Sequence, residues 1–285
     1  MASNRRYLVT GGTGFLGQAL ITRLRADPTQ DVNIVVIARD EGNLDALVTR
    51  FPGIETIAGD IVDPYACARA CQDVDGIYHL AAFKYVGLAE SNVQRCIISN
   101  VMGTLNLLEE TRRVQPAFII GTSTDKAAKV EGVYGATKFL QERLFLEYET
   151  MHPDTRYRQV RFGNILYSTG SVLCKWRDRL KNHEEILVTD PTATRFYWSA
   201  DAAVDCIFDC LRHTPDAHPY TPMMKAASVR RLLDAMIRKY DTSGSPKIRT
   251  IGLQSGESLH EVISVNGPDS SAAEQYTDVE LDALV

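Results

Sequence analysis

The sequence predicts an α/β fold in which a doubly wound parallel sheet is joined to a smaller C-terminal lobe. Three observations lead to this prediction. Apolar runs alternate with segments of helical period through the first half of the chain. The runs are almost continuously apolar, as strands are when helices bury both faces of a parallel sheet. The alternation fades after Asn164, and four prolines between positions 191 and 222 then interrupt shorter segments.

The expected strands are, in chain order, RRYLVT, NIVVIA, IETIAG, DGIYHLAA, PAFIIGTS and YRQVRFGN. Between the first three of these strands, apolar residues at helical spacing predict two helices, one over 15–25 and one that ends near Arg50. Two long helices are expected over 91–114 and 134–151. In the second half, shorter helices are expected over 202–211 and 229–239.

The composition is that of an ordinary globular protein, with 45% apolar and 24% charged residues. The net charge of −5 lacks the basic excess of nucleic-acid binders, so no nucleic acid is expected as a partner. No apolar run approaches the roughly 20 residues that a membrane helix needs. These features predict a soluble, cytoplasmic protein without a membrane partner.

The cysteines form two pairs with helical spacing, Cys67 with Cys71 and Cys206 with Cys210. Such pairs could bind a metal or act in redox chemistry, or they could be small apolar residues on a buried helix face. Neither spacing is that of zinc ligands. The second interpretation is therefore favoured, and no metal site is expected.

A glycine-rich turn, GGTGFLG, follows the first expected strand and opens the first helix. Glycines let backbone N–H groups approach a pyrophosphate, whose charge is favoured at a helix N-terminus. The turn therefore predicts a Rossmann-type dinucleotide site. The loop residues expected at the cofactor are Gly11, Thr13, Gly14, Phe15, Leu16 and Gly17.

The end of the second strand should carry the residue that reads the adenosine ribose. Arg39 stands there and is suited to pair with a 2′-phosphate, which favours NADP. Asp40 follows and could hold a free 2′-hydroxyl, so NAD stays possible. Asp60, after the third strand, is either an adenine contact or an ordinary turn residue.

Tyr134 and Lys138 are four residues apart at the start of a helix and so lie on one face. A tyrosinate can take the proton of an alcohol while hydride leaves for nicotinamide. Its pKa of about 10 must then fall, and an adjacent lysine charge and the nicotinamide charge would lower it. Thr124, at the end of the preceding strand, can hydrogen-bond the same alcohol.

With these motifs, the chain resembles the extended short-chain dehydrogenases/reductases. More narrowly, it is similar to the UDP-N-acetylglucosamine 4,6-dehydratases of polysaccharide biosynthesis that invert C5. The matching segments are GGTGFLG, ARDE, GDIVD, LAAFKYVGLAESN, NVMGTLNLLE, STDKAAKVEGVYGATK, RFGNILYSTGSV, TDPTATRF and GESLHEVI. The resemblance implies a UDP-sugar substrate, a 4-keto-6-deoxy sugar nucleotide as product, and a nicotinamide cofactor that is reduced and reoxidised in each turnover. It also implies a homo-oligomer, in which the two long helices could pair across a two-fold axis.

The resemblance assigns a second pair of residues to the elimination. Lys126 is expected to remove the C5 proton, and Asp125 to protonate the leaving C6 hydroxyl. A lysine that acts as a base must be neutral, so burial or a nearby positive charge is expected to depress the pKa of Lys126. The alternative is a salt-bridged Asp-Lys turn without a catalytic role.

Further site residues follow from the matching segments. Those expected at the cofactor are Ile61, Ala81, Ala82, Lys84 and Asn100, together with Arg39, Asp60, Tyr134 and Lys138. Those expected at the substrate are Lys84, Asn164, Gly170, Ser171, Arg195 and Glu257. The implied domains are a dinucleotide-binding domain over 1–165, a sugar-nucleotide lobe over 166–267 that may exchange segments with it, and a loosely held tail over 268–285.

The chain departs from the family pattern at the substrate end. Tyr167 and Thr169 stand where the family has a small residue and an arginine. Gln254 and Ser258 stand where it has an arginine and a lysine. Because arginine–phosphate contacts are strong, these changes leave the identity of the sugar nucleotide open. A 4-epimerase or reductase would need Tyr134 but not an Asp-Lys pair, and a non-catalytic nucleotide-binding protein is the third alternative.

Overall fold

Six parallel strands form the central sheet of the computed structural model, which describes residues 5–27 and 31–285. The strands are β1 (Arg5–Thr10), β2 (Val32–Ala38), β3 (Glu55–Ala58), β4 (Gly76–His79), β5 (Phe118–Thr124) and β6 (Arg156–Phe162). Their order is β3-β2-β1-β4-β5-β6, with every neighbouring pair parallel. All carboxyl ends therefore share one edge, and the order reverses between β1 and β4. Ligands of doubly wound sheets bind at that reversal.

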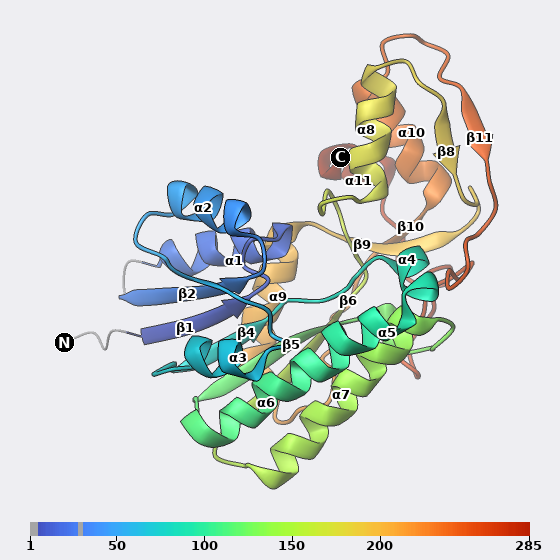
Figure 1. Cartoon of the computed structure of the whole chain (residues 1–285). Helices are drawn as coiled ribbons and strands as arrows, with labels where there is room; N and C mark the ends of the chain where they lie inside the picture. The colour runs from blue at the N-terminus through green and yellow to red at the C-terminus, as the bar shows by residue number, and fades with distance from the viewer. Residues whose placement is uncertain (1–4, 28–30) are drawn as a thin grey trace.

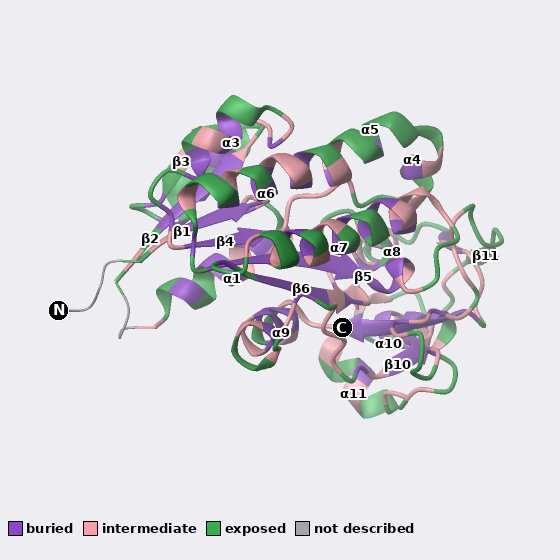
Figure 2. Ribbon diagram, turned by 90° about the horizontal axis from the view of Figure 1, so that it is seen from below, coloured by how far each residue is buried: buried purple, intermediate pink, exposed green. Residues whose placement is uncertain are grey.

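Helices cover both faces of this sheet (Figure 1). One face packs against α1 (Phe15–Arg25), α2 (Glu41–Arg50) and α9 (Ala200–His213). The other packs against α3 (Pro64–Ala70), α6 (Gly103–Val114) and α7 (Val133–Met151). Burial is concentrated in the strands between these layers (Figure 2), as the continuous apolar runs predicted. The predicted α/β fold class is confirmed, and no helix in the described part of the chain is long and apolar enough to cross a membrane.

Short polar side chains mark where several helices begin. Asp40 precedes α2 and accepts a hydrogen bond of 2.7 Å from the backbone N–H of Asn43. Thr277 and Glu280 cap the last helix, α11 (Asp278–Leu284), reciprocally, each accepting from the other's backbone N–H. Such caps satisfy N–H groups that have no partner inside the helix. The sequence thus sets these helix starts locally.

The long helix expected over 91–114 forms as three consecutive segments. They are α5 (Val93–Ile97), a π-helical turn (Ile98–Met102) and α6, and the short α4 (Val86–Ser91) precedes them. A π turn inserts an extra residue and changes which side chains face inward. Here it contains Asn100, which is 1% exposed and points away from solvent.

The remaining segments build a smaller lobe beside the carboxyl edge of the sheet (Figure 1). Its strands are β7 (Asn164–Ile165), β9 (Thr194–Trp198) and β10 (Ala226–Ser228) in one sheet, and β8 (Ile186–Val188) with β11 (Ile248–Thr250) in another. Its helices are α8 (Val172–Lys181), α10 (Val229–Tyr240) and α11, packed around Trp176. The lobe is not continuous in sequence, because α9 returns to the central sheet and packs against α1.

The two cysteine pairs lie on buried helix faces. Cys67 and Cys71 belong to the core beneath α3, and Cys206 and Cys210 to the core beneath α9. Burial raises the pKa of all four thiols. They therefore pack as small apolar residues, as expected. Within residues 5–27 and 31–285, no group of three or more His, Cys, Asp and Glu side chains is placed to hold a metal ion.

The C-terminal segment differs from the loosely held tail that was expected over 268–285. Leu281 and Val285 are 0% and 3% exposed and belong to the core of the lobe. Backbone hydrogen bonds also join Ala226 of β10 to this segment on both sides, from its N–H to Glu274 and from Tyr276 to its carbonyl. The polar composition concealed the few apolar residues that anchor the segment.

Leu281→Ala is expected to destabilise the protein by about 2–5 kcal/mol, because it leaves a cavity in the core of the lobe. Val279→Ala is the matched control, since Val279 is 80% exposed on the same helix. Urea unfolding of both variants measures the difference. A free energy of unfolding for Leu281→Ala equal to that of Val279→Ala would mean that the segment is not held in solution.

Candidate functional site

A cavity of about 1220 Å³ lies along the carboxyl edge of the sheet and extends under the lobe. Pockets for one small molecule usually measure ~300–1,000 Å³, so this cavity has room for two ligands side by side. The expected site residues that line it are Gly11, Thr13, Gly14, Phe15, Leu16, Gly17, Arg39, Asp60, Ile61, Ala81, Ala82, Lys84, Thr124, Lys126, Tyr134, Lys138, Asn164, Gly170, Ser171, Arg195 and Glu257. Two others, Asn100 and Asp125, lie behind the described lining.

The glycine turn between β1 and α1 has the geometry of a phosphate cradle. Gly11 has a φ of +69°, and a Cβ there would lie 2.8 Å from the backbone nitrogen of Ala81. No side chain caps α1 and no acidic residue lies in its first turn, so its N–H groups remain open to an anion. Thr10 accepts a hydrogen bond from the same nitrogen of Ala81 and contacts the buried His79, which fixes the turn. These residues fit the pyrophosphate of a dinucleotide.

Arg39 and Asp40, which were expected to read the ribose, directly follow β2. The Arg39 side chain is 64% exposed, and its guanidinium lies 3.8 Å from the carboxylate of Asp60. Asp40 uses one carboxylate oxygen to cap α2. Both Arg39 and Asp40 are exposed, so each presents a charged group to a ligand at the end of β2.

Tyr134 and Lys138 lie one turn apart at the start of α7, as their spacing predicted. The Lys138 ammonium donates hydrogen bonds of 2.8 Å to the Thr122 carbonyl and to the Gln141 side chain. Burial lowers the pKa of Lys138 to about 8. Lys138 thus lines the cavity, where these hydrogen bonds fix its ammonium.

The pKa of Tyr134 is raised to about 12, because burial outweighs the favourable effects of the Lys126 charge and the nearby Thr124 hydroxyl. The expectation of a depressed pKa is thus not met by the protein's own groups. The lysine charge that favours the phenolate comes first from Lys126, whereas the sequence pointed to Lys138. A further positive charge next to the phenol would have to come from a ligand.

Asp125 and Lys126 form a 3₁₀ turn at the end of β5, directly beside Tyr134. A Cβ on Gly135 would lie 2.3 Å from the Lys126 carbonyl oxygen, so only glycine lets α7 approach the turn this closely. One Asp125 oxygen, Oδ1, accepts from the Thr124 hydroxyl at 2.8 Å and from the Lys126 ammonium at 3.1 Å. Its other oxygen, Oδ2, is buried without a hydrogen-bond partner within the described part of the chain. A ligand group that donates a hydrogen bond would satisfy this oxygen.

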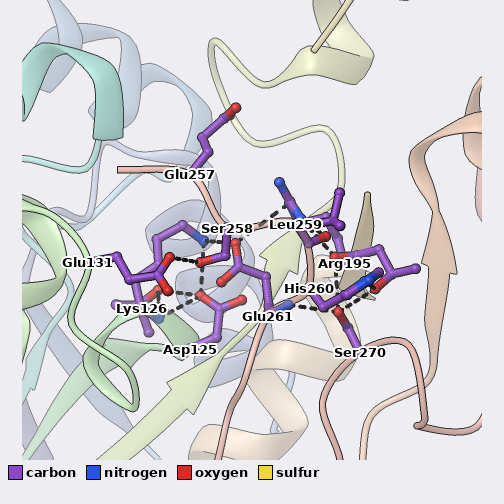
Figure 3. Close-up of polar contacts among 12 residues, drawn as sticks. Asp125, Lys126, Glu131, Arg195, Glu257, Ser258, Leu259, His260, Glu261 and Ser270 are labelled. Carbon is purple, nitrogen blue, oxygen red and sulfur yellow. Dashed lines mark hydrogen bonds and ion pairs between the residues drawn. The ribbon is translucent and has the colours of Figure 1, made fainter. Parts of the chain in front are cut away.

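The Lys126 ammonium also lies 3.2 Å from a carboxylate that the sequence did not predict at the site, Glu261 (Figure 3). Burial tends to lower the pKa of Lys126, but the charges of Asp125 and Glu261 outweigh it and raise the pKa above its ordinary value. The expected depression is therefore wrong for the protein by itself. The only sequence signal for Glu261 was its place at the end of the matching segment GESLHEVI.

Backbone contacts hold Glu261 in this position. Its N–H donates to the Ser270 hydroxyl at 2.8 Å, and the Ser270 N–H donates back to the Glu261 carbonyl at 2.8 Å. The Ser270 hydroxyl also donates to the Thr194 carbonyl of β9 at 3.0 Å. Ser270 is fully buried. The segment that was expected to be a tail therefore fixes a charged group at the site.

Asn100 supports the site from below. Its amide bonds to the backbone of Phe83 on both sides, accepting at 2.6 Å and donating at 3.0 Å, and it donates to the Thr137 hydroxyl at 3.0 Å. Asn100 was expected to contact the cofactor directly, but its amide is instead used in these hydrogen bonds within the protein. The side chain joins the cavity-lining segment 81–84 to the helix that carries Tyr134 and Lys138.

The substrate end of the cavity brings together residues from both halves of the chain. The Lys84 ammonium donates to the Thr169 carbonyl at 3.1 Å, and Gly170 packs against the Tyr85 ring with a φ of +76°. The side-chain amide nitrogen of Asn164 is buried without a partner among the described residues. A ligand oxygen there would satisfy this donor.

Arg195 and Glu257, two of the residues expected at the substrate, already have partners within the protein. Arg195 donates to the carbonyls of Thr194 and Leu259 and lies 3.6 Å from the carboxylate of Glu261. Glu257 accepts from the backbone N–H of Gln254 at 3.1 Å.

Tyr167, one of the departures from the family pattern, does not line the described cavity. Its hydroxyl lies 3.2 Å from that of Tyr240 and 3.7 Å from the Met236 sulfur, so the side chain packs into the lobe. Tyr167 therefore supports its loop from inside the lobe, whereas Thr169 and Gly170 line the cavity.

Comparison with known proteins agrees with this geometry. The family described as polysaccharide biosynthesis protein matches residues 7–281, nearly the full length. The chain belongs to this family. It lies on the extended short-chain dehydrogenase/reductase branch of polysaccharide biosynthesis, and its six-stranded parallel sheet with flanking helices is of the Rossmann type.

Curated relatives of this family member match along most of their own length. An uncharacterized membrane protein of Methanocaldococcus jannaschii is 31% identical over 274 residues, 92% of this chain and 81% of the relative. A UDP-N-acetylglucosamine 4,6-dehydratase (inverting) of Campylobacter jejuni is 28% identical, over 97% of this chain and 82% of the relative. A UDP-glucose 4-epimerase of Rickettsia canadensis is 29% identical, over 98% of this chain and 82% of the relative.

Solved structures reproduce the fold of this family member. Pen from Bacillus thuringiensis superposes with a TM-score of 0.92 at 25% identity, covering 99% of this chain and 97% of Pen. The dTDP-glucose 4,6-dehydratase DesIV from Streptomyces venezuelae, solved with NAD and TYD bound, gives a TM-score of 0.81 at 20% identity, covering 98% of this chain and 95% of DesIV. The second likeness shows the fold alone.

Proposed function

We propose that this protein is a sugar-nucleotide 4,6-dehydratase that acts on UDP-N-acetylglucosamine and inverts C5. The observation that carries the proposal is the Asp125-Lys126 turn, which lies beside Tyr134 in the cavity. Oxidation of C4 alone needs a tyrosine base, whereas elimination of water across C5 and C6 needs a further base and acid. The match to the inverting dehydratase of Campylobacter jejuni supports the choice of substrate and stereochemistry.

The protein's own residues take these roles in two stages. Tyr134 accepts the proton of the C4 hydroxyl, and Thr124 orients that hydroxyl. The nicotinamide, when bound, would accept hydride from C4 and return it to C6. Lys126 Nζ takes the proton of the C5–H bond, while a proton on Asp125 goes to O6 as the C6–O bond breaks and water leaves.

Because the pKa of Lys126 is raised, the Asp125-Lys126 pair must first exchange a proton to become reactive. The resting pair is an ammonium and a carboxylate 3.1 Å apart, and the reactive pair is an amine and a carboxylic acid. One proton shift from Lys126 to Asp125 converts the first into the second. Exclusion of water by a bound sugar would favour the neutral pair, because desolvation disfavours charged forms. Elimination then returns both residues to the resting charges. The proton that C5 needs as hydride returns to C6 comes from solvent, and it replaces the proton that the Tyr134 phenol loses to solvent before C4 oxidation.

A 4-epimerase is the second candidate, supported by the similarity to the Rickettsia canadensis enzyme. An epimerase would use Tyr134 and Lys138 and would have no use for a proton-exchanging pair at C5. The Asp125-Lys126 turn therefore favours the dehydratase.

Incubation with UDP-N-acetylglucosamine and NADP, followed by mass spectrometry, separates the two. We expect a product lighter by one water, with no net consumption of cofactor. A C4 epimer of unchanged mass would instead establish the epimerase. Recovery of unchanged substrate with NADP and also with NAD would contradict both enzyme functions and favour a non-catalytic nucleotide-binding protein.

Lys126→Met should block elimination while oxidation at C4 continues at a lower rate. The variant keeps the side-chain length and removes the base, and it also removes a charge that favours the Tyr134 phenolate. Loss of a general base costs about 10²–10⁴-fold in rate. In a single turnover, reduced nicotinamide absorbance should accumulate without dehydrated sugar. In deuterated water, wild type should place deuterium at C5 and the variant should not.

Lys129→Met is the matched control, since Lys129 is exposed and pairs with Glu131 on the same loop. It should behave as wild type in both measurements. Rapid deuterium uptake by Lys126→Met would transfer the base role to another group, such as Asp125.

For the cofactor, we propose a preference for NADP, held by Arg39 at the 2′-phosphate. Arg39→Ala should then weaken NADP binding by about tenfold or more and leave NAD binding unchanged, because hydrogen bonds to charged groups contribute about 1.5–3 kcal/mol. Arg212→Ala, an exposed arginine in the last turn of α9, is the control. Calorimetric titration with both dinucleotides decides; equal affinity of the wild type for NAD and NADP would refute the role of Arg39.

A further inference from the structure

Glu261 is a buried acidic side chain that the sequence did not predict at the site. It is 3% exposed, and burial and the nearby charge of Asp125 raise its pKa. It comes from a segment 135 positions away from Lys126, counted as 261 minus 126, and yet the two side chains meet at 3.2 Å. Close contact with a catalytic lysine, combined with backbone anchoring, indicates a placed charge.

We propose that Glu261 is a positioning residue that holds Lys126 in its charged form and separates it from Arg195. Its catalytic consequence rests on the dehydratase function proposed above. Asp125 alone would pair with Lys126 through one oxygen. Glu261 adds a second carboxylate to the same ammonium (Figure 3).

The groups that face Lys126 come from four parts of the fold. Asp125 belongs to its own turn, and Tyr134 approaches from α7. Glu261 approaches from the C-terminal segment, and Arg195 from β9. Two carboxylates and two cations make a cluster that is neutral as a whole. Removing the charge of Glu261 leaves Lys126 with Asp125 alone and takes from Arg195 the carboxylate that it faces, so the repulsion between the two cations is uncompensated.

Glu261 thereby sets how readily Lys126 gives its proton to Asp125. With Glu261 charged, the ammonium is stabilised and the shift to the reactive pair is uphill until substrate excludes water. After Lys126 takes the C5 proton, the same carboxylate stabilises the ammonium that forms. Glu261 keeps its charge throughout, so it acts on the reaction only through Lys126.

Glu261→Gln tests this inference, because it keeps the shape of the side chain and removes the charge. The reactivity of Lys126 toward acetic anhydride is measured against pH by peptide mass spectrometry, with the exposed Lys247 of the same digest as reference. We expect the Lys126 titration to move to lower pH by at least ~1 unit, the size of shift that a charge within ~4–6 Å produces. Glu261→Asp, which keeps the charge, should restore much of the wild-type behaviour.

Glu131→Gln is the matched control, since Glu131 contacts Ser258 of the same segment and pairs with Lys129. Its Lys126 titration should equal that of the wild type. An unshifted titration in a folded Glu261→Gln protein would overturn the inference. If that variant does not fold, the wild type still decides: Lys126 titrating below Lys247 would contradict a lysine held charged by two carboxylates.

A second measurement links the charge to the reaction. The pH profile of deuterium incorporation at C5 should move to lower pH in Glu261→Gln, while the single-turnover rate of C4 oxidation stays within about twofold of the wild type. A purely structural role would lower both rates together and leave the profile in place. The acetylation experiment uses no substrate, so a wild type that fails to dehydrate the sugar would refute the proposed function without touching the Lys126 titration.

Discussion

The Lys126 ammonium lies between two carboxylates that the fold brings from distant parts of the chain. Asp125 ends β5, and Glu261 comes from the segment that crosses back from the lobe. Taking ions out of water costs several kcal/mol each, so such a cluster persists only where partners are fixed and charges balance. Gly135 lets α7 close over the turn, and Ser270 fixes Glu261 against β9. Much of the packing around the cavity therefore serves one ion cluster.

The same cluster explains why the site by itself is held in a resting state. Tyr134 is a neutral phenol with a pKa of about 12, and Lys126 is a charged ammonium. The proposed dehydration needs the other protonation state of each group: a tyrosinate that can accept a proton and a lysine that has lost one. Both changes would follow from binding, since a cationic nicotinamide favours the phenolate and a desolvated cavity favours the neutral Asp-Lys pair. In the proposed mechanism, proton transfer is therefore coupled to the binding of both cofactor and sugar nucleotide.

The sequence predicted those parts of the fold and site whose physical cause is local. The glycine turn follows from three glycines between a strand and a helix, and the Tyr134–Lys138 face follows from helical spacing. The parallel sheet follows from continuous apolar runs. Each of these can be read within about twenty residues, and the structure agrees with the predicted fold class.

The features that the sequence did not predict depend on contacts between distant segments. Nothing near Lys126 indicated that Glu261 would reverse the expected direction of its pKa shift. Asn100 was expected at the cofactor, but a π turn directs it inward to Phe83 and Thr137. The polar C-terminal segment was expected to be loose, although Leu281 anchors it in the lobe. Burial and pairing across the fold decide these positions, and neither is visible in local spacing.

The most direct test of the central claim is a crystal structure of the Tyr134→Phe variant with NADP and UDP-N-acetylglucosamine, in which chemistry is blocked before C4 oxidation. The dehydratase mechanism predicts C4 of the sugar beside the substituted aromatic ring and the nicotinamide, with C5 facing Lys126 Nζ within ~3–3.5 Å, the separation of reacting atoms in a productive complex. Asp125 should face O6. A sugar bound with C4 in place but with C5 and O6 turned away from Lys126 and Asp125 would contradict this mechanism and leave the pair without a role in the reaction.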